Sequence, residues 1–217
     1  MSKYLIIICS IYILGCSFKA PESQWQIRSK NAFNSYSNNF LSGNETLAKN
    51  DLNRAVRHIN VSADLNKLAR LYLSVCALNI ATGINDKCEQ YLDIKDLTQT
   101  QSLSSYYALL QGILKTGDIE HLPLNYQEFA SHLLNKNYNQ AFKAIELINK
   151  PSSRFIAASI IKNKLTANDR EKLIKDASYY GYKNIVIFWL EQSLIKSESI
   201  SEQQKLIKKI QILKNNQ

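Results

Sequence analysis

The chain has 217 residues, and its 27 Lys and Arg against 18 Asp and Glu give a formal net charge of +9. It contains only 6 Gly and 3 Pro, which argues against a β-fold with many turns and favours helices. The length is enough for one sizeable core or for a short helical array. We expect most of the lysines to lie on the solvated surface.

Residues 4–16 form an apolar run, YLIIICSIYILGC, which follows a single positive charge at Lys3. This layout is typical of a secretory signal peptide. A membrane-spanning helix needs about twenty apolar residues. The run is therefore too short to be expected to remain as a transmembrane anchor.

The run ends in Ile-Leu-Gly-Cys, which resembles the lipobox of bacterial lipoproteins, although Leu14 replaces the usual small residue. The resemblance implies cleavage between Gly15 and Cys16 and a lipid on the Cys16 thiol, whose several acyl chains would suffice for stable anchoring. Ser17, rather than Asp, implies the outer membrane if the cell is Gram-negative. The alternatives are a plain signal peptide or an uncleaved anchor, with Cys16 an incidental thiol.

We expect three parts: a leader at residues 1–15, a lipidated tether at 16–23 that contains Pro21, and a helical domain at 24–217. Through this domain, apolar residues recur at the three- and four-residue steps of amphipathic helices. A Ser-Gly-Asn sequence at residues 42–44 breaks the first of them. We predict an all-α fold with helices at about residues 24–40, 47–59, 64–81, 85–92, 102–115, 124–135, 137–149, 152–163, 167–180, 183–195 and 200–214.

Two local signals are specific. Thr166 precedes a helical pattern and is a suitable N-cap. Residues 185–190, IVIFWL, are apolar on every side, which predicts a central place for their helix.

Three tripeptides, at residues 50–52, 83–85 and 117–119, recur at intervals of 33 and 34 residues. Each resembles the turn of the tetratricopeptide repeat, a helix-turn-helix unit with small residues where its helices touch. A further such turn, at residues 137–141, arrives early and breaks the period. The resemblance implies a tetratricopeptide-like array of antiparallel helical hairpins, irregular in its C-terminal half. The alternative is an irregular antiparallel helical bundle.

The alignment places Cys76 and Cys88 at the two close-contact positions of one hairpin, where their Cα atoms could fall within the roughly 4.4–6.8 Å that a disulfide needs. Cys9 would leave with the leader and Cys16 would be acylated, so these two remain as an even pair in an oxidising space. They are either bonded or two buried free thiols. Their spacing matches no redox or zinc motif.

Motifs for catalysis or cofactors are missing from the sequence, and we predict no cofactor, no metal and no catalytic residue. His58, His121 and His132 have no metal-ligand spacing. The nucleophile elbow, the phosphate-binding loop and the dinucleotide fingerprint do not occur. Lytic transglycosylases use a Glu followed by Ser, but Glu22 and Glu198 lack the rest of that signature.

The repeat resemblance implies a concave face that holds partner peptides, with Asn44 and Tyr107 pointing into it. We therefore expect a lipid-anchored scaffold that binds an envelope protein or peptide rather than nucleic acid. Its partner and oligomeric state do not follow from the sequence. The alternatives are a cell-wall-acting enzyme of lytic-transglycosylase type and an assembly lipoprotein of a secretion or surface machine.

Overall fold

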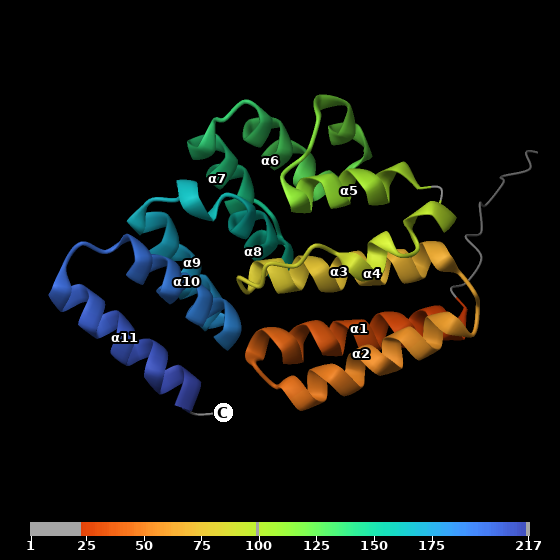
Figure 1. The fold of residues 1–217 in the computed structure, drawn as a ribbon, viewed down its shortest axis with the longest axis horizontal. Helices are drawn as coiled ribbons and strands as arrows, with labels where there is room; N and C mark the ends of the chain where they lie inside the picture. Colours follow the sequence, from red (N-terminus) through yellow and green to blue (C-terminus); the bar gives the residue numbers. More distant parts are fainter. Residues whose placement is uncertain (1–22, 99, 216–217) are drawn as a thin grey trace, which may run out of the picture.

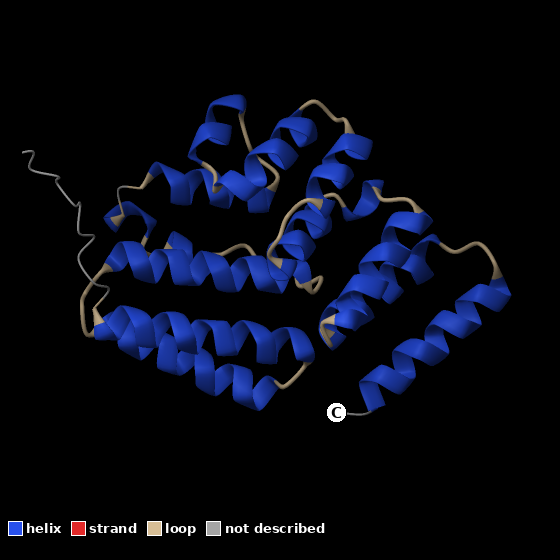
Figure 2. Ribbon diagram, turned by 180° about the vertical axis from the view of Figure 1, so that it is seen from behind, coloured by secondary structure: helices blue, strands red, loops and turns tan. Residues whose placement is uncertain are grey.

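The computed structural model describes residues 23–98 and 100–215, and within them every regular element is a helix (Figure 2). The predicted all-α fold is confirmed. The leader and Cys16 lie outside the described residues. Among the described helices, none combines the length and the hydropathy that crossing a bilayer requires.

The helices follow one another with short connections. They are α1 (Gln24–Ser42), α2 (Glu45–Asn60), α3 (Leu65–Ala81), α4 (Glu89–Leu92), α5 (Gln101–Gln111), α6 (Leu124–Leu134), α7 (Tyr138–Glu146), α8 (Pro151–Ile160), α9 (Ala167–Tyr179), α10 (Lys183–Lys196) and α11 (Ile200–Asn215). Three 3₁₀ segments lie between them: η1 (Lys95–Leu97), η2 (Thr116–His121) and η3 (Lys162–Lys164).

Several helix ends lie where local sequence signals place them. Gly43 ends α1 in the left-handed conformation, with φ of 82°. At the start of α9, the Thr166 hydroxyl accepts a bond from the Asp169 N–H (3.2 Å), and the Asp169 carboxylate accepts one from the Thr166 N–H (2.9 Å). The predicted cap at Thr166 is therefore confirmed.

Adjacent helices pack as antiparallel pairs. Figure 1 shows α3 between the α1–α2 hairpin and α5, with the α6–α7 pair beyond α8 and with α10 between α9 and α11. Helix α10 also contacts α1, because the Asn184 side chain donates a hydrogen bond to the Phe40 carbonyl (2.7 Å) across 144 residues of sequence. Residues 185–190 of α10 are all buried, as predicted for a central helix.

One feature of the repeat alignment and one predicted helix are not matched by the structure. Residues 50–52, which resemble a repeat turn, lie inside α2, in agreement with the helix predicted at 47–59, and buried Asp51 accepts a hydrogen bond from Asn39 of α1 (2.8 Å). The helix expected at 85–92 is limited to Glu89–Leu92, because Cys88 adopts a left-handed conformation that a helix cannot continue through. The turn expected near residue 137 is present between α6 and α7.

The helix expected at residues 102–115 also ends early. Gly112 takes a φ of 71° and ends α5 after Gln111. Residues 116–121, which include the third tripeptide, then form η2. The tripeptide period therefore does not correspond to a repeated turn, and the likeness to tetratricopeptide repeats stays a prediction.

Candidate binding groove

The two residues expected to bind a partner lie in different parts of the fold. Asn44 is exposed at the N-terminus of α2, where its side chain donates to Asn39 (3.4 Å). Tyr107 of α5 is half-buried, with its ring 5.5 Å from that of Tyr91 in α4. Figure 1 shows α3 between the α1–α2 hairpin and α5, and the common binding face of Asn44 and Tyr107 stays a prediction.

Cys76 and Cys88 form a disulfide in the structure. Cys76 of α3 is bonded to Cys88, with Cα atoms 5.2 Å apart, and both residues are 2% exposed. The Asp86 carboxylate accepts hydrogen bonds from the Cys88 N–H (2.6 Å) and from Asn79 (2.7 Å). Gln111 of α5 donates to the Asp86 carbonyl (3.0 Å). The disulfide therefore holds the loop before α4 against α3, and the Gln111 hydrogen bond holds the same loop against α5.

These two sulfurs and the Asp86 carboxylate also form the cluster of potential metal ligands found among the described residues. A metal would bind Cys as thiolate. The sulfurs are bonded to each other and the Asp86 oxygens accept hydrogen bonds. We therefore interpret this cluster as a structural feature that holds the loop in place, and not as a metal site.

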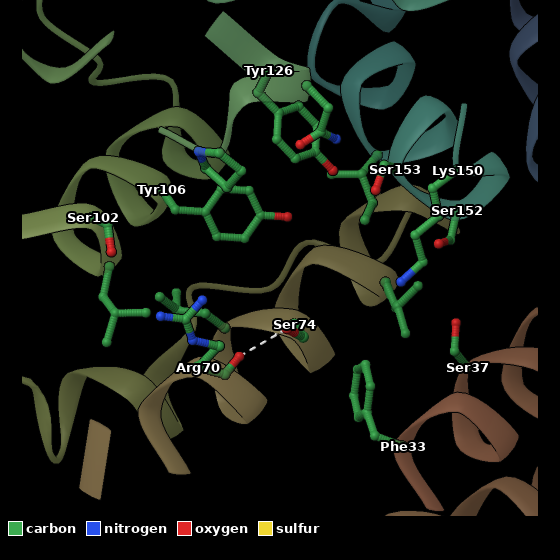
Figure 3. A pocket seen from close by; sticks show the side chains of 16 residues that line it. Phe33, Ser37, Arg70, Ser74, Ser102, Tyr106, Tyr126, Lys150, Ser152 and Ser153 are labelled. Atoms are coloured by element: carbon green, nitrogen blue, oxygen red, sulfur yellow. Dashed lines mark hydrogen bonds between the residues drawn. The ribbon is translucent and has the colours of Figure 1, made fainter. Parts of the chain in front are cut away.

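One hollow lies where α1, α3, α5, α6 and α8 meet, and we call it the central cavity (Figure 3). Its volume is about 240 Å³. It combines aromatic rings, aliphatic side chains, five serines and two cations. The lining residues are Phe33, Ser37, Arg70, Leu73, Ser74, Leu78, Ser102, Leu103, Tyr106, Pro123, Asn125, Tyr126, Lys150, Ser152, Ser153 and Ile156.

A second hollow of about 570 Å³, which we call the outer groove, runs between α1 and α3 toward their solvent-exposed ends. Its lining residues are Trp25, Gln26, Ser29, Lys30, Phe33, Ile59, Asp64, Asn66, Lys67, Arg70, Leu71 and Ser74. Phe33, Arg70 and Ser74 line both hollows. The central cavity and the outer groove therefore adjoin and share part of their walls, and together we call them the elongated site.

The two hollows differ in charge, because the outer groove contains an acidic residue and the central cavity contains only cations. In the outer groove, Lys67 pairs with Asp64 (3.1 Å) and lies over the Trp25 ring, 5.3 Å from its centroid. Burial alone would raise the pKa of Asp64, but the N–H and the ammonium of Lys67 outweigh it and lower that pKa. The central cavity contains Arg70 and Lys150, and no acidic residue lines it.

Buried hydroxyl groups line the central cavity. Ser37 and Ser152 are 9% and 6% exposed. Both residues belong to the lining of the cavity. The rings of Tyr106 and Tyr126 lie 5.5 Å apart. Burial raises the pKa of Tyr106 well above its ordinary value, with a further contribution from Tyr126, to which its phenol is hydrogen-bonded, and burial also raises the pKa of Tyr126.

The residues considered for chemistry in the sequence do not gather in this site. His58, His121 and His132 lie on α2, η2 and α6, and none of them belongs to the cluster of potential metal ligands found in the described part of the chain. Glu198 is exposed between α10 and α11, and Glu22 lies outside the described residues.

The lining of the central cavity was missed from the sequence. Arg70, Ser152 and their neighbours come from five helices and share no spacing that a motif could reveal. The serines and cations of the lining resemble ordinary surface residues until the fold brings them together. Comparisons of the chain with protein-family models, with curated proteins and with solved structures found no match.

Proposed function

We propose that this protein is a binding scaffold that holds a segment of a partner polypeptide in the elongated site formed by the central cavity and the outer groove. The shared lining of the two hollows by Phe33, Arg70 and Ser74 carries this proposal, because two adjoining hollows offer an elongated surface that suits an extended chain. Trp25 and Phe33 offer apolar contact area, which dominates the binding of aromatic and aliphatic side chains.

The composition of the central cavity favours binding over hydrolysis. A glycoside hydrolase needs carboxyl groups at the scissile bond. The central cavity has no acidic lining residue, and Asp64, which lines the outer groove, is engaged by Lys67. The competing hypothesis of a wall-acting enzyme thus has little support in this cavity.

The proposal also places the protein at the cell envelope, held by a lipid on Cys16. The leader at residues 1–15 and the polar tether at 16–23 support this part of the proposal. A Cys16→Ser variant should be lost from the membrane fraction and should no longer incorporate labelled palmitate. A processed variant that still partitions with the membrane would contradict lipid anchoring at this residue.

A photo-crosslinking experiment tests the binding role. A photoreactive amino acid replaces Ser74, which lines both hollows, or Ser104, which is exposed on α5 and serves as the matched control. The proposal predicts a discrete adduct from position 74 that position 104 does not give. Mass spectrometry of the adduct identifies the partner segment.

A synthetic peptide of that segment should then bind the purified protein and compete with the crosslink. Phe33→Asp, which places a charge in the wall shared by both hollows, should weaken the binding. The proposal is wrong if positions 74 and 104 give the same adducts, or if the peptide fails to compete.

A further inference from the structure

The central cavity presents cations without acidic partners. Within residues 23–98 and 100–215, neither Arg70 nor Lys150 forms an ion pair with a carboxylate. In Figure 3 the Arg70 guanidinium lies beside Tyr106, and the Lys150 side chain reaches in from the opposite wall. Two unneutralised cations that face one small space favour a negatively charged occupant.

The hydroxyl groups point to the same kind of occupant. As residues, Ser37 and Ser152 are more than nine-tenths buried, and both line the cavity. A serine hydroxyl at the wall of a cavity can donate a hydrogen bond to a ligand oxygen.

The N-terminus of α8 supplies a third contribution. This helix has ten residues, and its first intrahelical bond runs from the Arg154 N–H to the Lys150 carbonyl (3.1 Å). The N–H groups of Ser152 and Ser153 therefore have no backbone acceptor among the described residues. The partial positive charge of this helix end adds to the field of Lys150 beside it.

We propose that the central cavity binds an oxyanion, the carboxylate or phosphate group of a ligand, between Arg70, Lys150 and the first turn of α8. The planar guanidinium can donate two parallel hydrogen bonds to either group, whereas the ammonium acts as a point charge. This inference deepens the proposed binding role: the partner segment enters along the outer groove and is anchored by its anionic group in the cavity.

A titration with small anions tests this inference without knowledge of the partner. The mature protein, labelled with ¹⁵N and purified from membranes in mild detergent, is titrated with sodium phosphate or with sodium acetate. Sodium chloride holds the ionic strength constant, because surface electrostatics respond to salt. Saturable shifts of the Ser152 and Ser153 amide signals are expected with at least one of the two anions.

Two variants and two matched controls locate the site. Arg70→Gln should weaken the saturable binding by about tenfold, since it removes a charge-assisted contact, and Ser152→Ala should weaken it less. Arg57→Gln, an exposed cation on α2, and Ser104→Ala should leave it unchanged. The far-ultraviolet circular dichroism of each variant verifies that the fold is retained.

The outcomes separate the sources of the anion. Tighter binding of phosphate identifies a phosphate group, and acetate binding of equal or greater strength identifies a carboxylate. Shifts that never saturate, or that persist unchanged in Arg70→Gln, overturn the inference. Such a result leaves the crosslinking test of the partner segment intact, whereas saturable anion binding without a crosslinked partner contradicts only the polypeptide-binding role.

Discussion

Removal of the Cys76–Cys88 disulfide should destabilise the protein by an amount that the sequence separation sets. The bond closes a short loop, with a separation of 12 residues. In the chain-entropy model, a loop of this size contributes about 3 kcal/mol at 25 °C. For a chain of this length, 1 kcal/mol corresponds to about 2–4 °C in the melting temperature. The Cys76→Ala/Cys88→Ala variant should therefore melt about 6–12 °C lower.

The backbone at Cys88 provides a second, smaller effect. Its φ of 58° lies in the left-handed region, which costs a residue with a Cβ about 1–2 kcal/mol. Once the bond is gone, glycine at this position avoids that cost. We expect Cys76→Ala/Cys88→Gly to be more stable than the double alanine variant by about 1 kcal/mol.

Thermal unfolding followed by circular dichroism measures both differences, with and without reductant. The wild-type protein should lose stability when reduced, whereas the double variants should not respond to reductant. An unchanged melting temperature in the double alanine variant would refute the loop-entropy reasoning. Two thiols that can be alkylated in the unreduced, denatured protein would exclude the bond itself.

Two further predictions concern the packing and the charges around the site. Gly83 and Gly112 both have positive φ, at 89° and 71°, but only at Gly83 would a Cβ meet a neighbour, the Phe188 ring, at 2.5 Å. Gly112→Ala should cost about 1 kcal/mol in urea unfolding and Gly83→Ala about 1–3 kcal/mol more, and equal losses would contradict the packing argument. Because Lys67 lowers the pKa of Asp64 against the effect of burial, Asp64 stabilises the fold above its unfolded pKa, and this contribution is lost as pH falls through the folded pKa. Unfolding midpoints measured as a function of pH test this. The Asp64→Asn variant should lose less stability than the wild type as the pH falls. The Asp64→Ala variant should in addition be about 1 kcal/mol less stable at neutral pH, because it lacks the helix cap.

The sequence predicts the elements whose causes are local. Gly43 ends α1, Thr166 caps α9, and the apolar residues 185–190 are buried in α10. Each of these depends on a few neighbouring residues, through a left-handed conformation, a reciprocal pair of hydrogen bonds or a continuous apolar surface. Such signals can be recognised without any knowledge of the tertiary fold.

The sequence misleads where contacts between distant residues determine the local structure. Residues 50–52 resemble a turn, but Asp51 is accommodated inside α2 because Asn39 of another helix donates to it. The loop before α4 is held by Cys76 and by Gln111, which lies 23 residues beyond Cys88. The assignment of Asn44 and Tyr107 to one face depended on the repeat alignment, so it stays a prediction as the alignment does.

The contact of α10 with the first helices helps to fix the walls of the proposed site. In an open repeat array each unit contacts only its neighbours, and the shape of its concave surface can vary. Here α10 contacts α1 through Asn184 and Phe40, and the Phe188 ring lies against Gly83 just after α3. Helices α1 and α3 are therefore held near their C-terminal ends by α10. A site whose walls are fixed in this way loses less conformational freedom on binding, so more of its contact energy remains as affinity.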